Sequence, residues 1–370
     1  MENLELKKLF GASYLGKKVL VTGHCGFKGS WLSLWLNELG ANILGYSQIN
    51  KYQDSMLDQM NLGIKQVDGD ILDYKLLRDT VNDWSPDIIF HLAAQPLVGA
   101  SYEDPLGTFR TNIMGSLNVY DIAKDCPNTK AIVSVTTDKV YDNKEHIWGY
   151  RESDPLGGKD PYSGSKAAME VVTASYKYSF LNLEEYKKRH NILLATARAG
   201  NVIGGGDWSE NRIIPDIMKS AKKGSKTHIR KPEAIRPWQH VLEPLSGYLT
   251  LGQHLLLGNK KASTPFNFGP RYHDQHSVKD ILSIVKKNWR EVEYTFDQTK
   301  SDFKESYNLK LDSLLSKELL DWEPVWDIEQ TIFHTVEWYK QFIENNKSIE
   351  KQQLNEYVLD ARKKNMKWAQ

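Results

Sequence analysis

Two residues near position 160 have the types and spacing of a proton-transfer pair. Tyr162 and Lys166 are four positions apart, so a helix would place both side chains on one face. A lysine ammonium beside a phenol stabilises phenolate and lowers the pKa of the tyrosine, which makes it a usable base near neutral pH. This spacing also arises by chance on amphipathic helices, so it predicts catalysis only together with other features.

A second group of polar side chains, Thr137, Asp138 and Lys139, directly follows an apolar run. The Thr137 hydroxyl can hydrogen-bond to a substrate oxygen, and Asp138 can act as an acid. Lys139 can act as a base if it is deprotonated. Thr and Asp are also common turn formers, so a polar cap on the next segment is the alternative. Three consecutive functional side chains in a loop after a strand favour catalysis.

A glycine-rich turn joins the strand-like run 18–22 to the helix-like segment 30–39, with glycines at Gly23, Gly26 and Gly29. Glycines let a backbone turn tightly and approach a pyrophosphate, and a helix N-terminus supplies free N–H groups with a partial positive charge. Two residues separate the first two glycines, one more than in the G-x-G-x-x-G motif. The turn therefore indicates a dinucleotide site, although such turns also serve packing.

Alternating strand-like and helix-like segments would position these residues. Strand-like segments predict strands at 18–22, 42–46, 64–68, 87–92, 131–135 and 192–196. Helical spacing predicts helices at 30–39, 74–83, 111–124, 161 to about 189, and 328–342. Strands regularly separated by helices predict an α/β fold with a Rossmann-type doubly wound parallel sheet. Ligands of such sheets bind beyond the carboxyl ends of the strands.

Length and composition limit the class of protein. A chain of 370 residues exceeds the size at which one core stops growing. We expect a dinucleotide-binding domain at 16–200 and a smaller C-terminal lobe at 201–345, mainly substrate-binding and partly interleaved with the first. The tail at 346–370 is polar and charged, which predicts a solvated helix or a frayed end.

The net charge of +1 gives no general attraction to nucleic acid or membranes. Two cysteines, no signal peptide and no long apolar segment fit a cytoplasmic protein. No set of His, Cys, Asp and Glu has the spacing of metal ligands, so we expect no metal.

Several motifs resemble the extended short-chain dehydrogenase/reductase family of nucleotide-sugar enzymes. They are the glycine turn, Asp70-Ile71, the run 91–94, Thr137-Asp138 and Tyr162-x-x-x-Lys166. Longer stretches at 148–152, 200–208 and 235–245 are similar to the branch of that family that dehydrates CDP-D-glucose. The resemblance covers residues from about 16 to 339.

The resemblance implies NAD as the cofactor. The implied cofactor-binding residues are Gly23, Gly26, Phe27, Gly29, Asp70, Ile71, Ala93, Ala94, Tyr162 and Lys166. The glycines would hold the pyrophosphate, Asp70 and Ile71 would face the adenine, and Ala93 and Ala94 would line the cofactor channel. The strand at 42–46 is followed by Ser47 and Gln48, without the acidic residue that usually binds the adenosine ribose.

The implied reaction is a lyase reaction that converts CDP-D-glucose to CDP-4-keto-6-deoxy-D-glucose and water, a precursor for deoxysugars of surface polysaccharides. It combines oxidation at carbon 4, elimination across carbons 5 and 6, and reduction at carbon 6. The implied catalytic residues are Thr137, Asp138, Lys139, Tyr162 and Lys166. Asp138 would be the acid and Lys139 the candidate base, for which the pKa of its ammonium group would have to be depressed.

The second lobe would supply contacts to the substrate. Guanidinium groups of Arg212 and Arg236 suit the two phosphates of a nucleotide sugar. Asn201, Trp238 and His240 are further expected contacts, although aromatic residues in a proline-rich lobe are more often core. Family members usually pair through two helices, and the apolar faces at 111–124 and 167–180 could support a homodimer or homotetramer.

Two other functions stay open. A nucleotide-sugar 4-epimerase, or a 4,6-dehydratase for another nucleotide sugar, would share most of these motifs. An epimerase needs no acid and base for elimination, so Asp138-Lys139 weighs against it. A non-catalytic NAD-sensing protein on the same fold would have little use for Tyr162 and Lys166.

Overall fold

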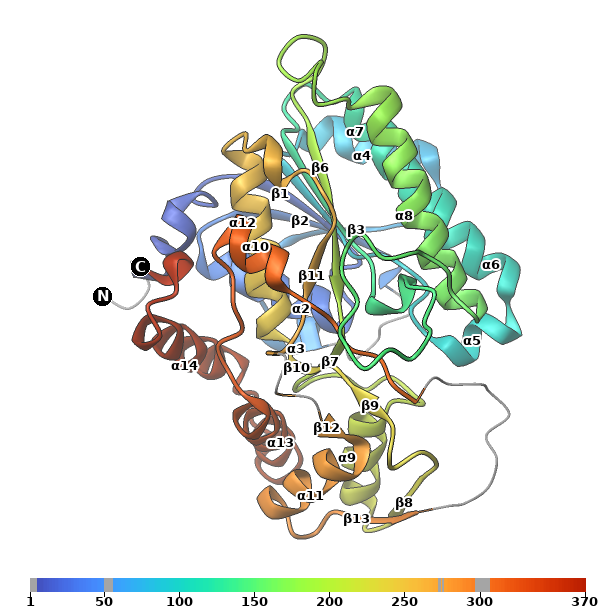
Figure 1. Ribbon diagram of the computed structural model, residues 1–370. Coiled ribbons are helices and arrows are strands. Elements are labelled where there is room, and N and C mark those ends of the chain that lie inside the picture. The colour runs from blue at the N-terminus through green and yellow to red at the C-terminus, as the bar shows by residue number, and fades with distance from the viewer. Residues whose placement is uncertain (1–4, 50–55, 272–273, 275, 297–306) are drawn as a thin grey trace.

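A seven-stranded parallel sheet forms the centre of the computed structural model, which describes residues 5–49, 56–271, 274, 276–296 and 307–370 (Figure 1). The strands lie in the order β11-β6-β5-β4-β1-β2-β3, and each neighbouring pair is parallel. Their bounds are β1 (Lys18–Thr22), β2 (Asn42–Ser47), β3 (Lys65–Asp68), β4 (Ile88–His91), β5 (Ala131–Val135), β6 (Leu193–Ala199) and β11 (Phe266–Phe268). The predicted doubly wound α/β fold is confirmed. The strand order reverses between β1 and β4, and ligands of such sheets bind at this point.

Helices cover both faces of the sheet, because alternate strand residues face opposite sides. In β1, Val19 and Val21 belong to one hydrophobic core, whereas Leu20 belongs to the other. The first core includes side chains of α2 (Phe27–Glu38), α10 (Leu242–Leu256) and α13 (Ile328–Asn345). The second includes side chains of α4 (Tyr74–Trp84), α7 (Gly115–Lys124) and α8 (Pro161–Phe180). Burial on both faces explains why the inner strands are continuous apolar runs in the sequence.

The helix predicted to run from 161 to about 189 ends earlier than expected. α8 ends at Phe180, and Leu181 has non-helical dihedrals of φ −124° and ψ 40°. In the following turn the Asn182 side chain accepts a hydrogen bond from the Glu184 backbone N–H at 2.9 Å. Such a local side-chain bond offers the backbone an alternative to the helix, and hydrophobic spacing alone does not reveal it.

Residues after 200 build a second lobe at the carboxyl ends of the strands and also return to the sheet. In Figure 1 this lobe lies below the sheet. It contains β7 (Asn201–Ile203), α9 (Ile213–Lys223), β8 (Lys226–Ile229), β9 (Ile235–Arg236), β10 (Trp238–His240), β12 (His276–Ser277), α11 (Val278–Asn288) and β13 (Glu293–Phe296). Between these segments, α10 packs against β5 and β6, and β11 extends the sheet beside β6.

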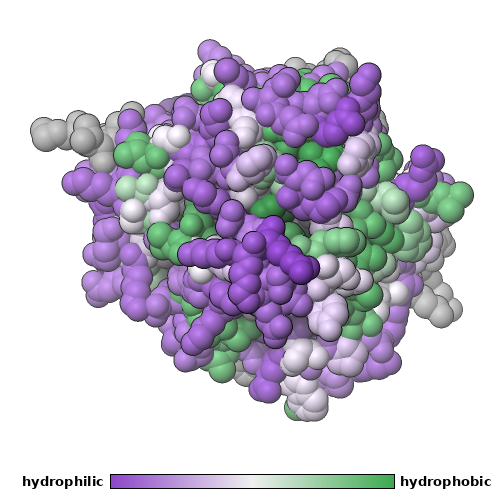
Figure 2. Space-filling view, turned by 90° about the horizontal axis from the view of Figure 1, so that it is seen from above, coloured by the Kyte–Doolittle hydropathy of each residue, from purple (hydrophilic) through white to green (hydrophobic). Residues whose placement is uncertain are grey.

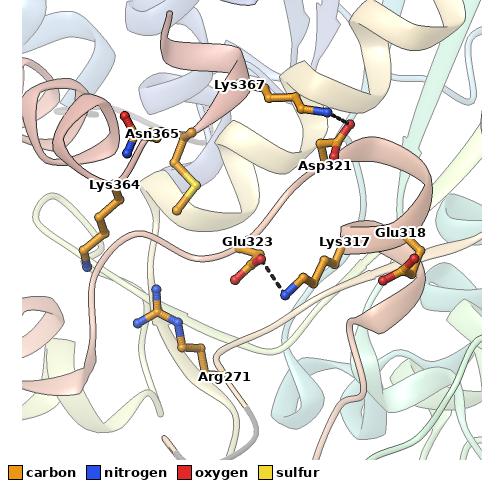
Figure 3. Close-up of a pocket in the computed structure, with 9 residues that line it drawn as sticks. Arg271, Lys317, Glu318, Asp321, Glu323, Lys364, Asn365 and Lys367 are labelled. Atoms are coloured by element: carbon orange, nitrogen blue, oxygen red, sulfur yellow. Dashed lines mark hydrogen bonds and ion pairs between the residues drawn. The ribbon is translucent and has the colours of Figure 1, made fainter.

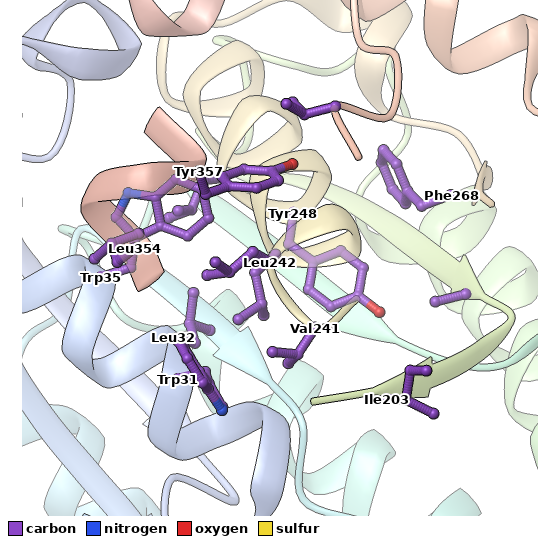
Figure 4. Packing of buried hydrophobic residues seen from close by; sticks show 14 of the residues in the cluster. Trp31, Leu32, Trp35, Ile203, Val241, Leu242, Tyr248, Phe268, Leu354 and Tyr357 are labelled. Carbon is purple, nitrogen blue, oxygen red and sulfur yellow. The ribbon is translucent and has the colours of Figure 1, made fainter. Parts of the chain in front are cut away.

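The tail differs from the solvated or frayed segment that its composition predicts. It forms α14 (Glu350–Lys363), whose apolar side chains Leu354, Tyr357 and Val358 are buried in the first core. Figure 4 shows Leu354 and Tyr357 beside Trp35 of α2. Farther on, the Trp368 ring stacks on Phe10 with ring centroids 5.1 Å apart. Charged residues such as Lys351 and Lys363 are exposed, so an average over the segment hides its apolar stripe.

Apolar side chains are exposed on the helices that follow β4. They include Leu106 in α6 (Pro105–Phe109) and Val171 and Tyr178 in α8. Figure 2 shows hydrophobic surface gathered on the side of the molecule where α6 and α8 lie. Among the described residues, no helix combines the length and the apolar character needed to cross a membrane.

Candidate active site

The first turns of α8 place Tyr162 and Lys166 beside the end of β5. Asp160 caps the helix, since its carboxylate accepts a hydrogen bond from the Ser163 N–H at 2.9 Å. Pro161 occupies the first helical position, where its missing N–H costs nothing. The Lys166 ammonium donates to the Val135 carbonyl at 3.1 Å. The structure therefore brings this pair to the carboxyl end of the sheet.

Thr137, Asp138 and Lys139 lie directly after β5, in a short turn at Asp138–Val140. The Thr137 hydroxyl donates to Asp138 Oδ1 at 3.0 Å, and it lies close enough to the Tyr162 phenol to lower the pKa of that phenol. The second oxygen of Asp138, Oδ2, is buried and has no hydrogen-bond partner among the described residues. A buried carboxyl with one unused oxygen is available to a ligand.

Burial sets the protonation states of these groups. It raises the pKa of Asp138, against the opposing effect of the Lys139 charge, and so favours a carboxyl that keeps its proton. It lowers the pKa of Lys166 to about 7, and the nearby Lys28 charge adds to this effect. It raises the pKa of Tyr162 to about 12, although the Thr137 side chain and the charge of Arg212 act the other way. The spacing of Tyr162 and Lys166 predicts a lowered pKa for the tyrosine, but its pKa is raised. Tyr162 therefore needs a further positive charge nearby to act as a base at neutral pH.

Two residues that we did not predict also belong to the site. The Lys28 ammonium, in the first turn of α2, donates to the Tyr248 hydroxyl of α10 at 3.3 Å. Burial lowers the pKa of Lys28 to about 8, with Arg212 acting in the same direction and Asp138 against it. Lys28 could have been noticed as a charged residue inside the glycine turn. Tyr248 had no sequence signal, because α10 joins the site only through the tertiary fold.

The glycine turn forms a cradle that side chains would fill. Gly23 has a positive φ of 75°, and a Cβ there would lie 2.7 Å from the Ala93 nitrogen. A Cβ on Gly29 would lie 2.1 Å from the Gly23 carbonyl oxygen. Gly26 is the N-cap of α2 and Phe27 its first residue, so the open N–H groups of the first helical turn lie at this cradle. These features fit the pyrophosphate of a dinucleotide.

The residues predicted for the adenine side follow β3. The Asp70 carboxylate is hydrogen-bonded by the Gln48 side chain, and the Asp70 carbonyl accepts from the Tyr46 hydroxyl at 2.9 Å. The Ile71 side chain is buried in the second core, where a Cβ on Gly115 would touch it. Ala94 follows Ala93 after β4, and the strands β1 and β2 lie between β4 and β3.

Both predicted arginines lie close enough to influence the catalytic groups electrostatically. Arg212 precedes α9 and pairs with the Asp207 carboxylate at 2.9 Å. Its charge acts on Tyr162 and Lys28, and the charge of Arg236 acts on Asp138. Positive charge is therefore gathered around the catalytic groups, as a diphosphate ligand requires.

The two aromatic residues predicted as substrate contacts are buried in the lobe. His240 has no exposed surface, and its ring lies edge-on to Trp326 with centroids 4.9 Å apart. Trp238 also belongs to the first core, although its indole N–H has no partner among the described residues. β10 pairs with β7 through Trp238 and Asn201. The expectation of a sugar contact does not fit His240, because the paired strands turn its ring into the core.

A separate pocket lies away from these residues (Figure 3). Its volume is about 620 Å³, and mostly charged side chains of α12 (Leu314–Leu320), of the loop after α12 and of the segment after α14 line it, together with Arg271. Ion pairs Lys317–Glu323 and Lys367–Asp321 cross its wall. None of the predicted site residues lines it. The described part of the chain also holds no group of three or more His, Cys, Asp and Glu side chains that could bind a metal.

Comparisons with known proteins find matches over most of the chain. The model of the GDP-mannose 4,6-dehydratase family matches residues 20–335. A CDP-glucose 4,6-dehydratase of Salmonella typhimurium is 43% identical over 347 residues, which are 93% of this chain and 96% of that protein. The dTDP-D-glucose 4,6-dehydratase of Homo sapiens is 26% identical, over 90% of this chain and 93% of its own length.

Solved structures show the same fold at low sequence identity. A dTDP-glucose 4,6-dehydratase from Bacillus anthracis in complex with NAD has a TM-score of 0.71 at 21% identity, and covers 89% of this chain and 98% of that one. A UDP-glucose 4-epimerase from Thermotoga maritima has a TM-score of 0.76 at 21% identity, covering 88% and 99%. The fold thus serves dehydratases and epimerases alike, and the site must distinguish them.

Proposed function

The chain belongs to the GDP-mannose 4,6-dehydratase family, and from this premise we propose that it converts CDP-D-glucose to CDP-4-keto-6-deoxy-D-glucose and water. The observation that carries the proposal is the 43% identity, over nearly the whole chain, with a CDP-glucose 4,6-dehydratase. The cluster of Thr137, Asp138, Tyr162 and Lys166 at one end of the sheet supports it.

NAD is the cofactor that we propose. The glycine cradle, with no room for side chains at Gly23 and Gly29, supports a bound pyrophosphate. Bound NAD would supply a hydride acceptor at carbon 4 of the sugar and a hydride donor at carbon 6. Oxidised nicotinamide is positively charged, which is the further charge that Tyr162 needs for its pKa to fall towards neutrality.

In the oxidation, Tyr162 would take the proton of the 4-hydroxyl group. The effect of the Thr137 side chain on the pKa of Tyr162 supports a position of both groups beside the 4-hydroxyl. Lys166 would hold the phenolate form through its positive charge while it stays anchored to the Val135 carbonyl. A pKa of about 7 means that a part of Lys166 is uncharged at neutral pH, so a nearby phenolate would help it to keep its proton.

In the elimination, the 4-keto group acidifies the proton at carbon 5, and the hydroxyl at carbon 6 leaves as water. Asp138 would donate the proton to this hydroxyl, and its burial and raised pKa support an acid that is protonated beforehand. Lys139 is the candidate base for the carbon-5 proton. The effects of the Arg212 and Arg236 charges on Tyr162 and Asp138 support their binding the diphosphate, with Asn201 as a further contact.

The product of this reaction would be a precursor for deoxysugars of surface polysaccharides. We also propose that the protein is a homo-oligomer, a homodimer or a homotetramer. The exposed apolar residues of α6 and α8, among them Leu106, Val171 and Tyr178, support a contact between copies.

Turnover of three nucleotide sugars tests the substrate. With CDP-, dTDP- and UDP-glucose at equal concentration, we expect the 4-keto-6-deoxy product, detected by its absorbance in alkali, to form fastest from CDP-glucose. Equal rates would remove the CDP assignment. Formation of the galactose epimer without loss of water would replace the dehydratase by an epimerase.

A further inference from the structure

A buried ion pair lies directly behind the catalytic groups. Arg198 of β6 and Glu170 of α8 are each about 2% exposed, and Arg198 Nε lies 2.9 Å from Glu170 Oε1. Arg198 Nη2 donates to Glu170 Oε2 at 3.0 Å. Thr136 donates to Oε1 at 2.6 Å and Thr196 to Oε2 at 2.8 Å. Each carboxylate oxygen thus accepts two hydrogen bonds, which offsets the cost of burying the charge.

The other end of the Arg198 guanidinium holds the loop after β5. Nη1 donates to the Tyr141 hydroxyl at 2.9 Å and to the Glu152 carbonyl at 3.1 Å. The Tyr141 hydroxyl in turn donates to Asn267 Oδ1 of β11 at 2.6 Å. The pair therefore contacts the segment 136–152 at Thr136, near its middle at Tyr141, and at its end.

The same pair is fixed to the catalytic helix. Glu170 follows Lys166 by four residues and Tyr162 by eight, so the three side chains lie along one side of α8. The segment 136–152 carries Thr137, Asp138 and Lys139. We propose that Glu170 and Arg198 are positioning residues. They hold the side chains proposed for the elimination, Asp138 and Lys139, at a fixed distance from the oxidation groups on α8, Tyr162 and Lys166. This inference rests on the proposed dehydratase function.

The two sets of groups depend on the pair to different degrees. Lys166 has its own anchor at the Val135 carbonyl, and α8 is held near Tyr162 by its Asp160 cap. A bond from Asn112 to the Ser165 hydroxyl at 2.8 Å adds a further anchor. Asp138, in contrast, is hydrogen-bonded only through Thr137 among the described residues. Loss of the pair should therefore displace Asp138 more than Tyr162.

A double substitution tests this role without leaving an unpaired buried charge. Glu170→Met with Arg198→Met replaces the pair by apolar side chains of similar size, which proteins often tolerate. We expect NAD reduction by CDP-glucose in a single turnover to slow only modestly, because Tyr162 and Lys166 keep their own anchors and only Thr137 of the oxidation groups lies on the segment 136–152. Dehydration should slow by about tenfold or more, because small misplacements of catalytic groups are costly. Bound NADH should therefore persist, with little change in KM.

A milder variant and a control complete the experiment. Tyr141→Phe removes one hydroxyl of the network and should show the same pattern to a smaller extent. Glu243→Gln changes a buried carboxylate of α10 that has no contact with the segment 136–152. It should lower stability without NADH persistence.

The outcomes separate the inference from the proposed function. Wild-type dehydration rates in the folded double variant would overturn the positioning role. Equal loss of oxidation and elimination, or NADH persistence in Glu243→Gln, would also overturn it. A wild-type protein that does not dehydrate CDP-glucose would overturn the proposed function, and the inference with it.

Discussion

Tyr162 needs a neighbouring charge to become a base, since burial raises its pKa to about 12. Replacing Tyr162 by Phe removes the proton acceptor and keeps the ring. We expect turnover to fall by about 10²- to 10⁴-fold, the usual worth of a general base. NAD affinity, measured by calorimetry, should change little. A variant that keeps more than about a tenth of the wild-type rate would contradict the assignment.

The Asp138 side chain distinguishes the two candidate activities, because a dehydratase needs an acid for the elimination and an epimerase does not. Asp138→Asn keeps the shape but cannot protonate the leaving hydroxyl. We expect a single turnover of NAD reduction followed by persistent NADH absorbance and bound 4-keto sugar nucleotide, because Thr137, Tyr162 and Lys166 remain. Lys139→Met should stop at the same stage if Lys139 is the carbon-5 base. Dehydration at near wild-type rates in both variants would favour the epimerase.

Candidate site residues were predictable from the sequence where the residues that act together are close along the chain. Spacing alone paired Tyr162 with Lys166, and the strand end pointed to Thr137 and Asp138. Lys28 and Tyr248 were missed, because their meeting depends on how α10 crosses the sheet. The burial of His240 was not predictable, because its motif does not say which side of a short strand faces the core.

Glu243 joins three elements through one buried carboxylate. Its oxygens accept from the Val325 and Trp326 N–H groups at 2.9 and 2.7 Å, and from the Tyr357 hydroxyl of α14 at 2.7 Å. Burial nevertheless raises its pKa to about 7. The folded state therefore binds this proton more tightly than the unfolded state, so Glu243 lowers the free energy of unfolding as pH rises from about 4.5 to about 7.

Glu243→Gln should remove this part of the pH dependence. The amide presents one oxygen to three donors, so we expect a loss of about 2–4 kcal/mol in the free energy of unfolding at neutral pH. Urea unfolding of both proteins at several pH values measures the effect. An unchanged pH slope in the variant would show that Glu243 does not titrate in this range.

Helices and strands were predictable where a single hydrophobic pattern runs through the whole segment. The six predicted strands are present. Burial on both faces makes the inner strands, such as β4 and β5, continuous apolar runs, whereas the edge strand β3 is mostly polar and exposed. β11 has only three residues, and no local pattern distinguishes it from the loops around it. The packing of α14 was missed because its apolar stripe lies within a charged segment, and its partners are in the first forty residues and in α10.

At the scale of the whole molecule, the exposed side of α8 should mediate assembly. Val171 and Tyr178 are seven residues apart and therefore share one side of the helix. Replacing both by Asp should lower the molar mass in light scattering to that of one chain. Leu257→Asp changes an equally exposed apolar residue at the end of α10 and should leave the mass unchanged. An unchanged mass in the double variant would place the contact elsewhere.

The central claim is that one site oxidises carbon 4, eliminates water and reduces carbon 6 of the same sugar. CDP-D-glucose labelled with deuterium at carbon 4 tests it most directly, with the product analysed by NMR and mass spectrometry. We predict a 4-keto-6-deoxy product that has lost one water and carries the deuterium at carbon 6. A galactose product with deuterium still at carbon 4, or a dehydrated product that carries no label, would contradict the account.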